Sequence, residues 1–202
     1  MQSIRHATSA LAALLFAATA AMPAHAADKT VKFGMVRSPA LAASPSCAPN
    51  AKATVKITPN GATETMVVNV SGLPANTDFD FFVIQQPGAP FGMAWYQGDI
   101  ETDASGNGSA KFIGRFSNET FIVAPGAASA PQTQPGDASS NPQTGPIQTY
   151  HLGLWFNAAA DAVAAGCPGA VTPFNGEHDA GVQVLNTSNF ANLEGPLLKV
   201  KS

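Results

Sequence analysis

Charged side chains are scarce in this sequence. Only 11% of the 202 residues are Asp, Glu, Lys or Arg, and the 13 acidic residues outnumber the 10 basic ones. A chain with a formal net charge of −3 lacks the basic footprint that binding to nucleic acids or to anionic membranes requires. The composition therefore predicts no nucleic-acid partner.

Long apolar runs are also missing. The longest, 11–22, is too short and too rich in alanine to span a membrane, which takes about 20 apolar residues. Arg5 precedes this run and the small-x-small tripeptide Ala24-His25-Ala26 follows it, which is the pattern of a secretory signal peptide. We predict cleavage after Ala26, leaving residues 27–202 as a single secreted or periplasmic domain without a membrane span. Because Arg5 is the only charged residue that cleavage removes, the mature chain has a formal net charge of −4.

Cysteine is almost absent, since Cys47 and Cys167 are the only two. A redox-active pair usually has the spacing Cys-x-x-Cys, which does not occur here. In an oxidising compartment, two distant cysteines most simply form a disulfide, in this case one that closes a loop of about 120 residues. We therefore predict a structural disulfide between Cys47 and Cys167.

Helical periodicity is confined to one stretch, 158–165, which Gly166 and Pro168 end. Elsewhere, short apolar runs alternate with turn-forming Gly, Pro and Asn, a pattern typical of an all-β sandwich or barrel. The expected strands are 54–58, 65–70, 79–84, 93–102, 110–116, 121–123, 150–156, 181–185 and 197–201. The stretch 79–84 is apolar on both faces, which predicts a central, covered strand. Residues 125–147 are rich in Pro and Gly and are expected to form a long flexible loop.

The connection between the second and third expected strands, Val70-Ser71-Gly72-Leu73-Pro74-Ala75-Asn76-Thr77-Asp78-Phe79, resembles the corner of fibronectin type III and related immunoglobulin-like domains. There, a Gly-Leu-x-Pro-x-Thr-x-aromatic run leads one strand across to the opposite sheet. Pro74 lies one position earlier than in that pattern, and Phe79 replaces the tyrosine whose hydroxyl makes the corner hydrogen bond. The resemblance implies an antiparallel immunoglobulin- or fibronectin-like sandwich. The stretch 151–186 resembles uncharacterised secreted bacterial proteins, and neither resemblance implies an activity.

Signatures of catalysis are missing. No Gly-x-Ser-x-Gly motif occurs, and the two histidines of the mature chain, His151 and His178, have no recognisable nucleophile as partner. The acidic residues are scattered, so their spacing does not single out a glycosidase pair. We therefore favour a non-enzymatic protein without a cofactor.

A metal site is the first alternative. Glu177, His178 and Asp179 put three potential ligands into one loop, and His151 could add a second imidazole. The His-x-x-x-His and Cys-x-x-Cys spacings that specify zinc are absent, so we favour a polar loop whose side chains bond to nearby backbone. The segment 103–108 begins like a calcium-binding EF-hand loop but lacks the closing glutamate, which predicts a hairpin turn instead.

Aromatic side chains are the remaining candidates for function. Trp95 and Tyr96 are neighbours on one expected strand, whose alternation must expose one of them, while His151 and Trp155 share the less apolar face of another. Exposed rings stack well on sugars, and the alternative is that these rings fill the core. We predict a non-enzymatic secreted or periplasmic protein that uses these four residues to bind a carbohydrate, a protein or another envelope component. A purely structural envelope component is the second alternative.

Overall fold

The computed structural model describes residues 30–116, 121–122, 146–147, 149–173 and 178–201. The predicted signal peptide and residues 125–145 of the predicted loop lie outside the described residues. The elements in the described part of the chain are β1 (Val31–Arg37), η1 (Pro39–Leu41), β2 (Lys52–Asn60), β3 (Thr63–Ser71), β4 (Phe79–Ile84), β5 (Ala94–Asp99), β6 (Gly108–Gly114), β7 (Phe121–Ile122), β8 (Pro146–Ile147), β9 (His151–Phe156), α1 (Ala159–Ala164), β10 (Gln183–Asn186) and η2 (Pro196–Lys199), where η denotes a 3-10 helix.

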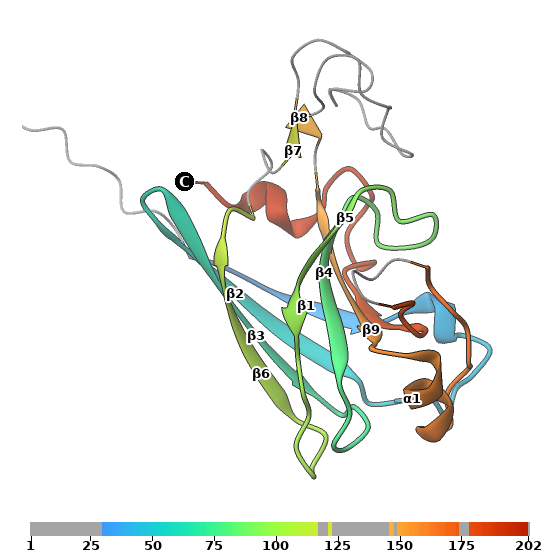
Figure 1. The fold of residues 1–202 in the computed structure, drawn as a ribbon. Coiled ribbons are helices and arrows are strands. Elements are labelled where there is room, and N and C mark those ends of the chain that lie inside the picture. Colours follow the sequence, from blue (N-terminus) through green and yellow to red (C-terminus); the bar gives the residue numbers. More distant parts are fainter. Residues whose placement is uncertain (1–29, 117–120, 123–145, 148, 174–177, 202) are drawn as a thin grey trace, which may run out of the picture.

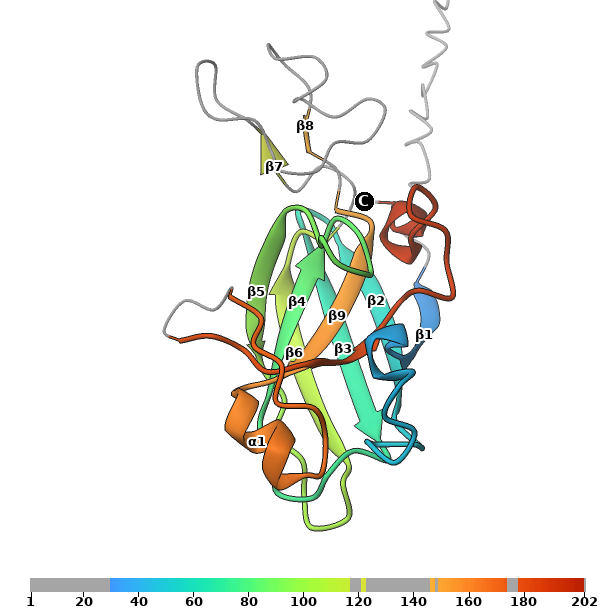
Figure 2. The same ribbon diagram turned by 90° about the vertical axis from the view of Figure 1, so that its right-hand side faces the viewer.

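Eight of these strands form one antiparallel sheet in the order β5-β4-β9-β10-β1-β2-β3-β6, while β7 pairs only with β8. Strand β1 joins the two halves of the sheet, because residues 31–35 pair with β2 whereas Val36 and Arg37 pair with β10. The sheet curls until its end strands, β5 and β6, lie near each other, which makes a nearly closed barrel (Figures 1 and 2). The predictions of an all-β antiparallel fold and of one short helix are confirmed. The single curled sheet is not clearly an immunoglobulin-like sandwich.

Side-chain packing closes the gap between β5 and β6. Gly98 of β5 lies against Phe112 of β6, so closely that a Cβ atom added to Gly98 would be 3.0 Å from the Phe112 ring. The Phe112 ring in turn stacks on that of Phe81 in β4, with centroids 5.3 Å apart and 7° between the planes. Because Gly98 has no side chain, β5 can lie directly against the Phe112 ring of β6, and the two end strands come close together.

The main core lies inside the barrel. Strands β2 and β3 alternate strictly, with Val55, Ile57, Met66 and Val68 buried between outward-facing neighbours that are polar apart from Val67. Strands β4 and β9 are instead buried along their whole length, on both faces, as predicted for residues 79–84. Their second face contributes to a smaller apolar cluster, whose buried members are Phe82, Ile84, Trp155 and Ala180.

Three parts of the strand prediction are wrong. Residues 146–147, expected in the long loop, form β8 and pair with β7. Residues 197–201 do not form a strand, because Pro196 presets a helical φ and the chain turns into η2 with Leu197 buried. Strand β1 is missing from the prediction, although its alternate residues Val31, Phe33 and Met35 pack against the core. Met35 is the one fully buried residue of the strand, and pairing with β2 and β10 holds β1 in the sheet.

The predicted disulfide is confirmed. Cys47 and Cys167 are bonded, with an S–S distance of 1.95 Å and Cα atoms 4.8 Å apart, and both residues are buried. The bond ties the segment after η1 to the loop after α1. Closing a loop of 120 residues stabilises the fold by about 4–5 kcal/mol in the chain-entropy model.

Candidate functional site

The four residues predicted to bind a ligand divide into two pairs. Trp95 and Tyr96 on β5 are exposed, with 57% and 43% of their surface accessible to solvent. His151 and Trp155 on β9 are completely buried, at 0% each. The structure therefore does not bring the four residues to one surface. For His151 and Trp155 it agrees with the alternative given above, that the side chains fill the core.

Loops cover the face of β9 that carries Trp155. The indole packs edge-on against Phe82 of β4 and Phe91 of the following loop, at centroid distances of 5.4 and 5.0 Å. Gly153 leaves room for the indole, because a Cβ atom there would lie 2.3 Å from the Trp155 ring. Trp155 thus serves as the centre of the second apolar cluster.

His151 is a structural residue of the same covered face. Its Nδ1 lies 2.8 Å from the Thr187 hydroxyl and its Nε2 lies 3.1 Å from the carbonyl oxygen of Asn192. Because a carbonyl can only accept, Nε2–H donates to Asn192 and Nδ1 accepts from Thr187. Burial lowers the pKa of His151 to about 4, so the imidazole is neutral at physiological pH. The side chain holds the C-terminal segment against β9.

The residues predicted as metal ligands lie in different environments. His178 and Asp179 are exposed, and Glu177 lies outside the described residues. Both ring nitrogens of His151 are already engaged in hydrogen bonds. Across the described ranges, no group of three or more His, Cys, Asp or Glu side chains is placed to hold a metal ion.

Both Trp95 and Tyr96 are exposed because β5 is an end strand with β4 as its one ladder neighbour. Trp95 is opposite Val83 and Tyr96 is opposite Phe82, so the two side chains leave opposite faces of β5. The Tyr96 ring packs on Phe82 at a centroid distance of 5.5 Å, and its hydroxyl donates to Asp99 at 2.5 Å. These two contacts fix the orientation of an aromatic ring that remains accessible.

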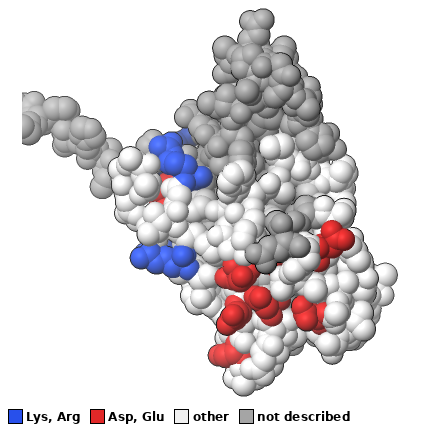
Figure 3. Space-filling model, in the orientation of Figure 1, with Lys and Arg blue, Asp and Glu red and all other residues white. Residues whose placement is uncertain are grey.

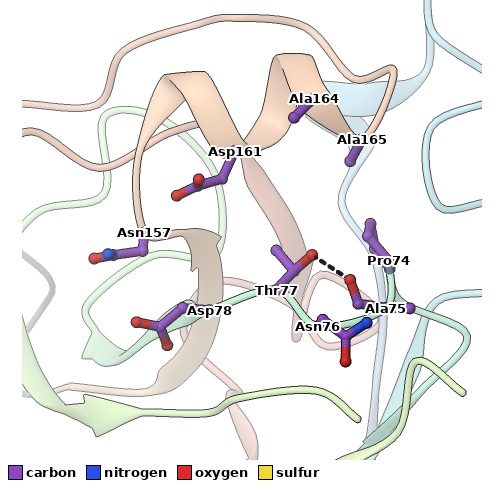
Figure 4. A pocket seen from close by; sticks show the side chains of 9 residues that line it. All are labelled: Pro74, Ala75, Asn76, Thr77, Asp78, Asn157, Asp161, Ala164 and Ala165. Atoms are coloured by element: carbon purple, nitrogen blue, oxygen red, sulfur yellow. Dashed lines mark hydrogen bonds between the residues drawn. The ribbon is translucent and has the colours of Figure 1, made fainter. Parts of the chain in front are cut away.

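A polar cavity of 640 Å³ opens between the segment after β3 and helix α1 (Figure 4). The residues that line it are Pro74, Ala75, Asn76, Thr77, Asp78, Asn157, Asp161, Ala164 and Ala165. The side chains of Asp78, Asn157 and Asp161 lie near one another on one side of this cavity (Figure 4). Two carboxylates and an amide thus converge there from the start of β4, the end of β9 and helix α1.

The connection between β5 and β6 holds one wall of this cavity in place. Segment 103–108 is a tight turn, in which Asp103 Oδ1 accepts from two backbone N–H groups, at 2.8 and 3.0 Å. The prediction that this turn closes a hairpin is wrong, because β5 pairs with β4 and β6 pairs with β3. The adjoining Thr102 hydroxyl donates to the carbonyl oxygen of Pro74 at 2.6 Å and accepts from the Thr77 N–H at 3.0 Å. The segment that resembles a fibronectin corner does lead the chain from β3 across to β4, and Thr102 fastens it.

Electrostatic coupling connects the cavity to β5. Burial raises the pKa of Asp78, and the charge of Asp99 raises it further; Glu101 and Asp161 act in the same direction, against the hydrogen bond from Phe79 N–H. These carboxylates therefore share one region of negative potential. Acidic side chains gather in one part of the surface in Figure 3.

The same region extends to the exposed tyrosine. Burial and the hydrogen bond to Asp99 raise the pKa of Tyr96 above its usual range, and Asp80 and Asp78 add to the effect. The phenol is therefore a stable hydrogen-bond donor at neutral pH. We call the exposed edge of β5 (Trp95, Tyr96 and Asp99), together with Asp78 and Asp161, the aromatic–acidic surface. The two rings border this edge from opposite faces of β5, and the carboxylates lie on the side of Tyr96.

The cavity residues are absent from the sequence-based prediction. Asp78 and Asp161 are far apart in the chain, and only the packing of α1 beside the β3–β4 corner brings them together. The sequence shows only where each residue lies: Asp78 is near the end of the corner segment, and Asp161 is in the first turn of the helix. Neither signal indicates that the two share a cavity.

No helix in the described part of the chain is both long enough and apolar enough to cross a membrane. Compared with models of known protein families the chain matches none, and a comparison with curated proteins found no significant relative.

Proposed function

We propose that the mature chain is a non-enzymatic, secreted or periplasmic protein that binds carbohydrate at the aromatic–acidic surface. The observation that carries this proposal is the exposure of Trp95 and Tyr96 at the edge of β5, with the Tyr96 hydroxyl bonded to Asp99 and the charge of Asp99 acting on Asp78 in the polar cavity. The proposed ligand is an envelope or extracellular polysaccharide rather than a small metabolite, because the two rings lie exposed on an end strand rather than inside an enclosed pocket.

The chemistry of this surface suits sugars. The C–H groups on one side of a sugar ring pack on aromatic faces, and the exposed rings of Trp95 and Tyr96 supply such faces. Carboxylates such as Asp78 and Asp161 accept hydrogen bonds from sugar hydroxyls, and the amide of Asn157 can both donate and accept. Since Phe82 and Asp99 already orient Tyr96, little conformational entropy is lost on binding. The negative potential favours neutral or amino sugars over acidic ones.

The test is titration of the mature protein with neutral polysaccharides and with chitosan, a polymer of an amino sugar, followed by calorimetry. Trp95→Ala and Tyr96→Ala should each weaken binding about tenfold or more, because a stacked ring contributes roughly 1.5 kcal/mol. Val171→Ala is the matched control, since Val171 is apolar, equally exposed at 57% and outside this surface. Asp161→Asn should weaken binding of chitosan more than that of a neutral polymer.

The alternative of a purely structural envelope component makes the opposite prediction. In that case the mature wild-type protein binds none of these polymers, and Trp95→Ala alters only the free energy of unfolding. Either result would contradict the proposed function. Circular dichroism of each variant checks that any loss of binding occurs in a folded protein.

A further inference from the structure

A row of lysines crosses the outer face of β1, β2, β3 and β6. Lys32 on β1 is directly opposite Lys56 on β2. Lys56 is opposite Val67 on β3, and Val67 is opposite Lys111 on β6. All three lysines are exposed. Because adjacent strands are about 5 Å apart, the three ammonium groups form a line of positive charge across the sheet.

This arrangement is unfavourable for the free protein. Like charges directly opposite each other on antiparallel strands are destabilising, and no carboxylate on these four strands faces outward. Their one acidic residue, Glu64, is completely buried inside the barrel near Arg115. In Figure 3 most of the acidic side chains gather in one part of the visible surface, away from the basic ones. In an otherwise acidic protein, the outward side of these four strands thus carries lysines without a carboxylate of its own.

Small polar side chains flank the row of lysines. In the neighbouring cross-strand rows, the outward-facing polar residues are Thr54, Asn69, Ser109, Thr58 and Thr65. The Ser109 hydroxyl is 2.9 Å from the Asn69 side-chain oxygen, so these groups already form hydrogen bonds across the face. Gly34 has no side chain, and a hollow of 470 Å³ lies there between Lys32 and Lys56. We call these outward-facing residues of β1, β2, β3 and β6 the lysine face.

We propose that the lysine face binds an acidic polysaccharide, a linear sugar polymer with a carboxylate on its repeating units. The line of ammonium groups complements a line of carboxylates, while the threonine, serine and asparagine side chains complement sugar hydroxyls. This second surface lies on different strands from the aromatic–acidic surface and has the opposite charge. The inference therefore does not depend on the function proposed above.

Other polyanions fit the face less well. It has no outward-facing aromatic ring on which nucleic-acid bases would stack. Its exposed apolar residues, Val36 and Ile113, lie on the two outermost of the four strands and do not form one patch that would insert into a membrane.

The test measures binding of the mature protein to polygalacturonate at low ionic strength, with fully methyl-esterified polygalacturonate as the uncharged polymer of the same backbone. The wild-type protein should bind the acidic form and not the ester, and added salt should weaken binding. Lys56→Gln/Lys111→Gln should weaken it about tenfold. The control Lys199→Gln/Lys201→Gln removes the same charge from the C-terminal segment and should bind like the wild type.

Several results would overturn the inference. The first is an absence of wild-type binding to polygalacturonate, and the second is equal loss in the two double variants, which would indicate an effect of net charge alone. Equal binding of the ester, or tighter binding of poly(dT) or of anionic lipid vesicles than of polygalacturonate, would assign the face to another ligand class. Trp95→Ala should bind polygalacturonate like the wild type. Binding at the lysine face can therefore be observed even if the function proposed for the aromatic–acidic surface is wrong.

Discussion

The two halves of the barrel differ in what lies on their outer faces. In β2 and β3 the buried and exposed positions alternate, and the outer face is open to solvent. In β4 and β9 every residue is buried, because loops cover the outer face as well. A two-residue turn joins β2 to β3, whereas longer segments follow β4, β9 and β10 and supply the cover. The comparison shows that, among the described strands of the sheet, a side chain of functional type is available for binding in the uncovered half or at the edge of β5, but not on β4 or β9.

The largest expected effect comes from exchanging the two tryptophans separately for alanine. Trp155→Ala should reduce the free energy of unfolding by about 4 kcal/mol, because the indole is completely buried between Phe82 and Phe91. Trp95→Ala, the same chemical change at an exposed site, should cost less than about 1 kcal/mol. Urea denaturation of both variants measures the difference. If both variants lost a similar free energy of unfolding, the covered and open halves of the barrel would not differ as described.

The pH dependence of stability sharpens the same comparison. Because the pKa of His151 is lowered from 6.5 to about 4 on folding, the unfolded chain binds more protons between these pH values. Acidification from pH 6.5 to 4 should therefore remove about 3 kcal/mol of stability through this group, and the contribution is fully present above pH 6.5.

The measurement is denaturation of the wild type and of His151→Gln at pH 7 and at pH 4.5. The wild type should be the more stable protein at pH 7, and its advantage should shrink at the lower pH. His178→Gln is the control, since it removes an imidazole from an exposed position and should keep the wild-type slope. A His151→Gln variant with an unchanged slope would show that the covered histidine is not the titrating group.

Local pattern was sufficient to predict much of the fold. The alternation in β2 and β3 and the two apolar faces of β4 follow directly from residue spacing, and with two cysteines there was one intramolecular pairing to choose. The same spacing placed His151 and Trp155 together on the second face of β9, which is where they are. It could not show that the segments around Phe91 and Asn192 fold over that face. Burial by loops that are distant in sequence depends on the tertiary fold. Polar or amphipathic side chains such as His151 and Trp155 do not indicate in the sequence that they will be buried.

The surfaces were harder to predict than the core. The cavity beside Asp78 and Asp161 depends on where α1 packs, which no local motif specifies. The lysine face depends on register: Lys32, Lys56 and Lys111 are widely separated in sequence and become neighbours only when four strands pair. Formal net charge averages over the whole surface, so a chain with an excess of acids can still carry a basic face.

The smallest expected effect concerns the free energy stored in that basic face. Lys56→Glu replaces the repulsion between Lys56 and Lys32 with an attraction and should raise the free energy of unfolding by about 0.5 kcal/mol at low ionic strength. The gain should disappear in about 1 M salt, where the screening length is roughly 3 Å. Lys52→Glu makes the same charge change opposite Ser71, where no lysine is present, and should have little effect.

Whether Lys56→Glu raises or lowers the free energy of unfolding shows if the lysine row serves stability or binding. If Lys56→Glu is more stable than the wild type and also no longer binds polygalacturonate, the lysine row is kept at the expense of stability, as a binding surface would be. If Lys56→Glu and Lys52→Glu shift stability equally, the repulsion is negligible and the lysines are simply solvated. The second result would remove the energetic argument for the lysine face, and the open half would then differ from the covered half in exposure alone.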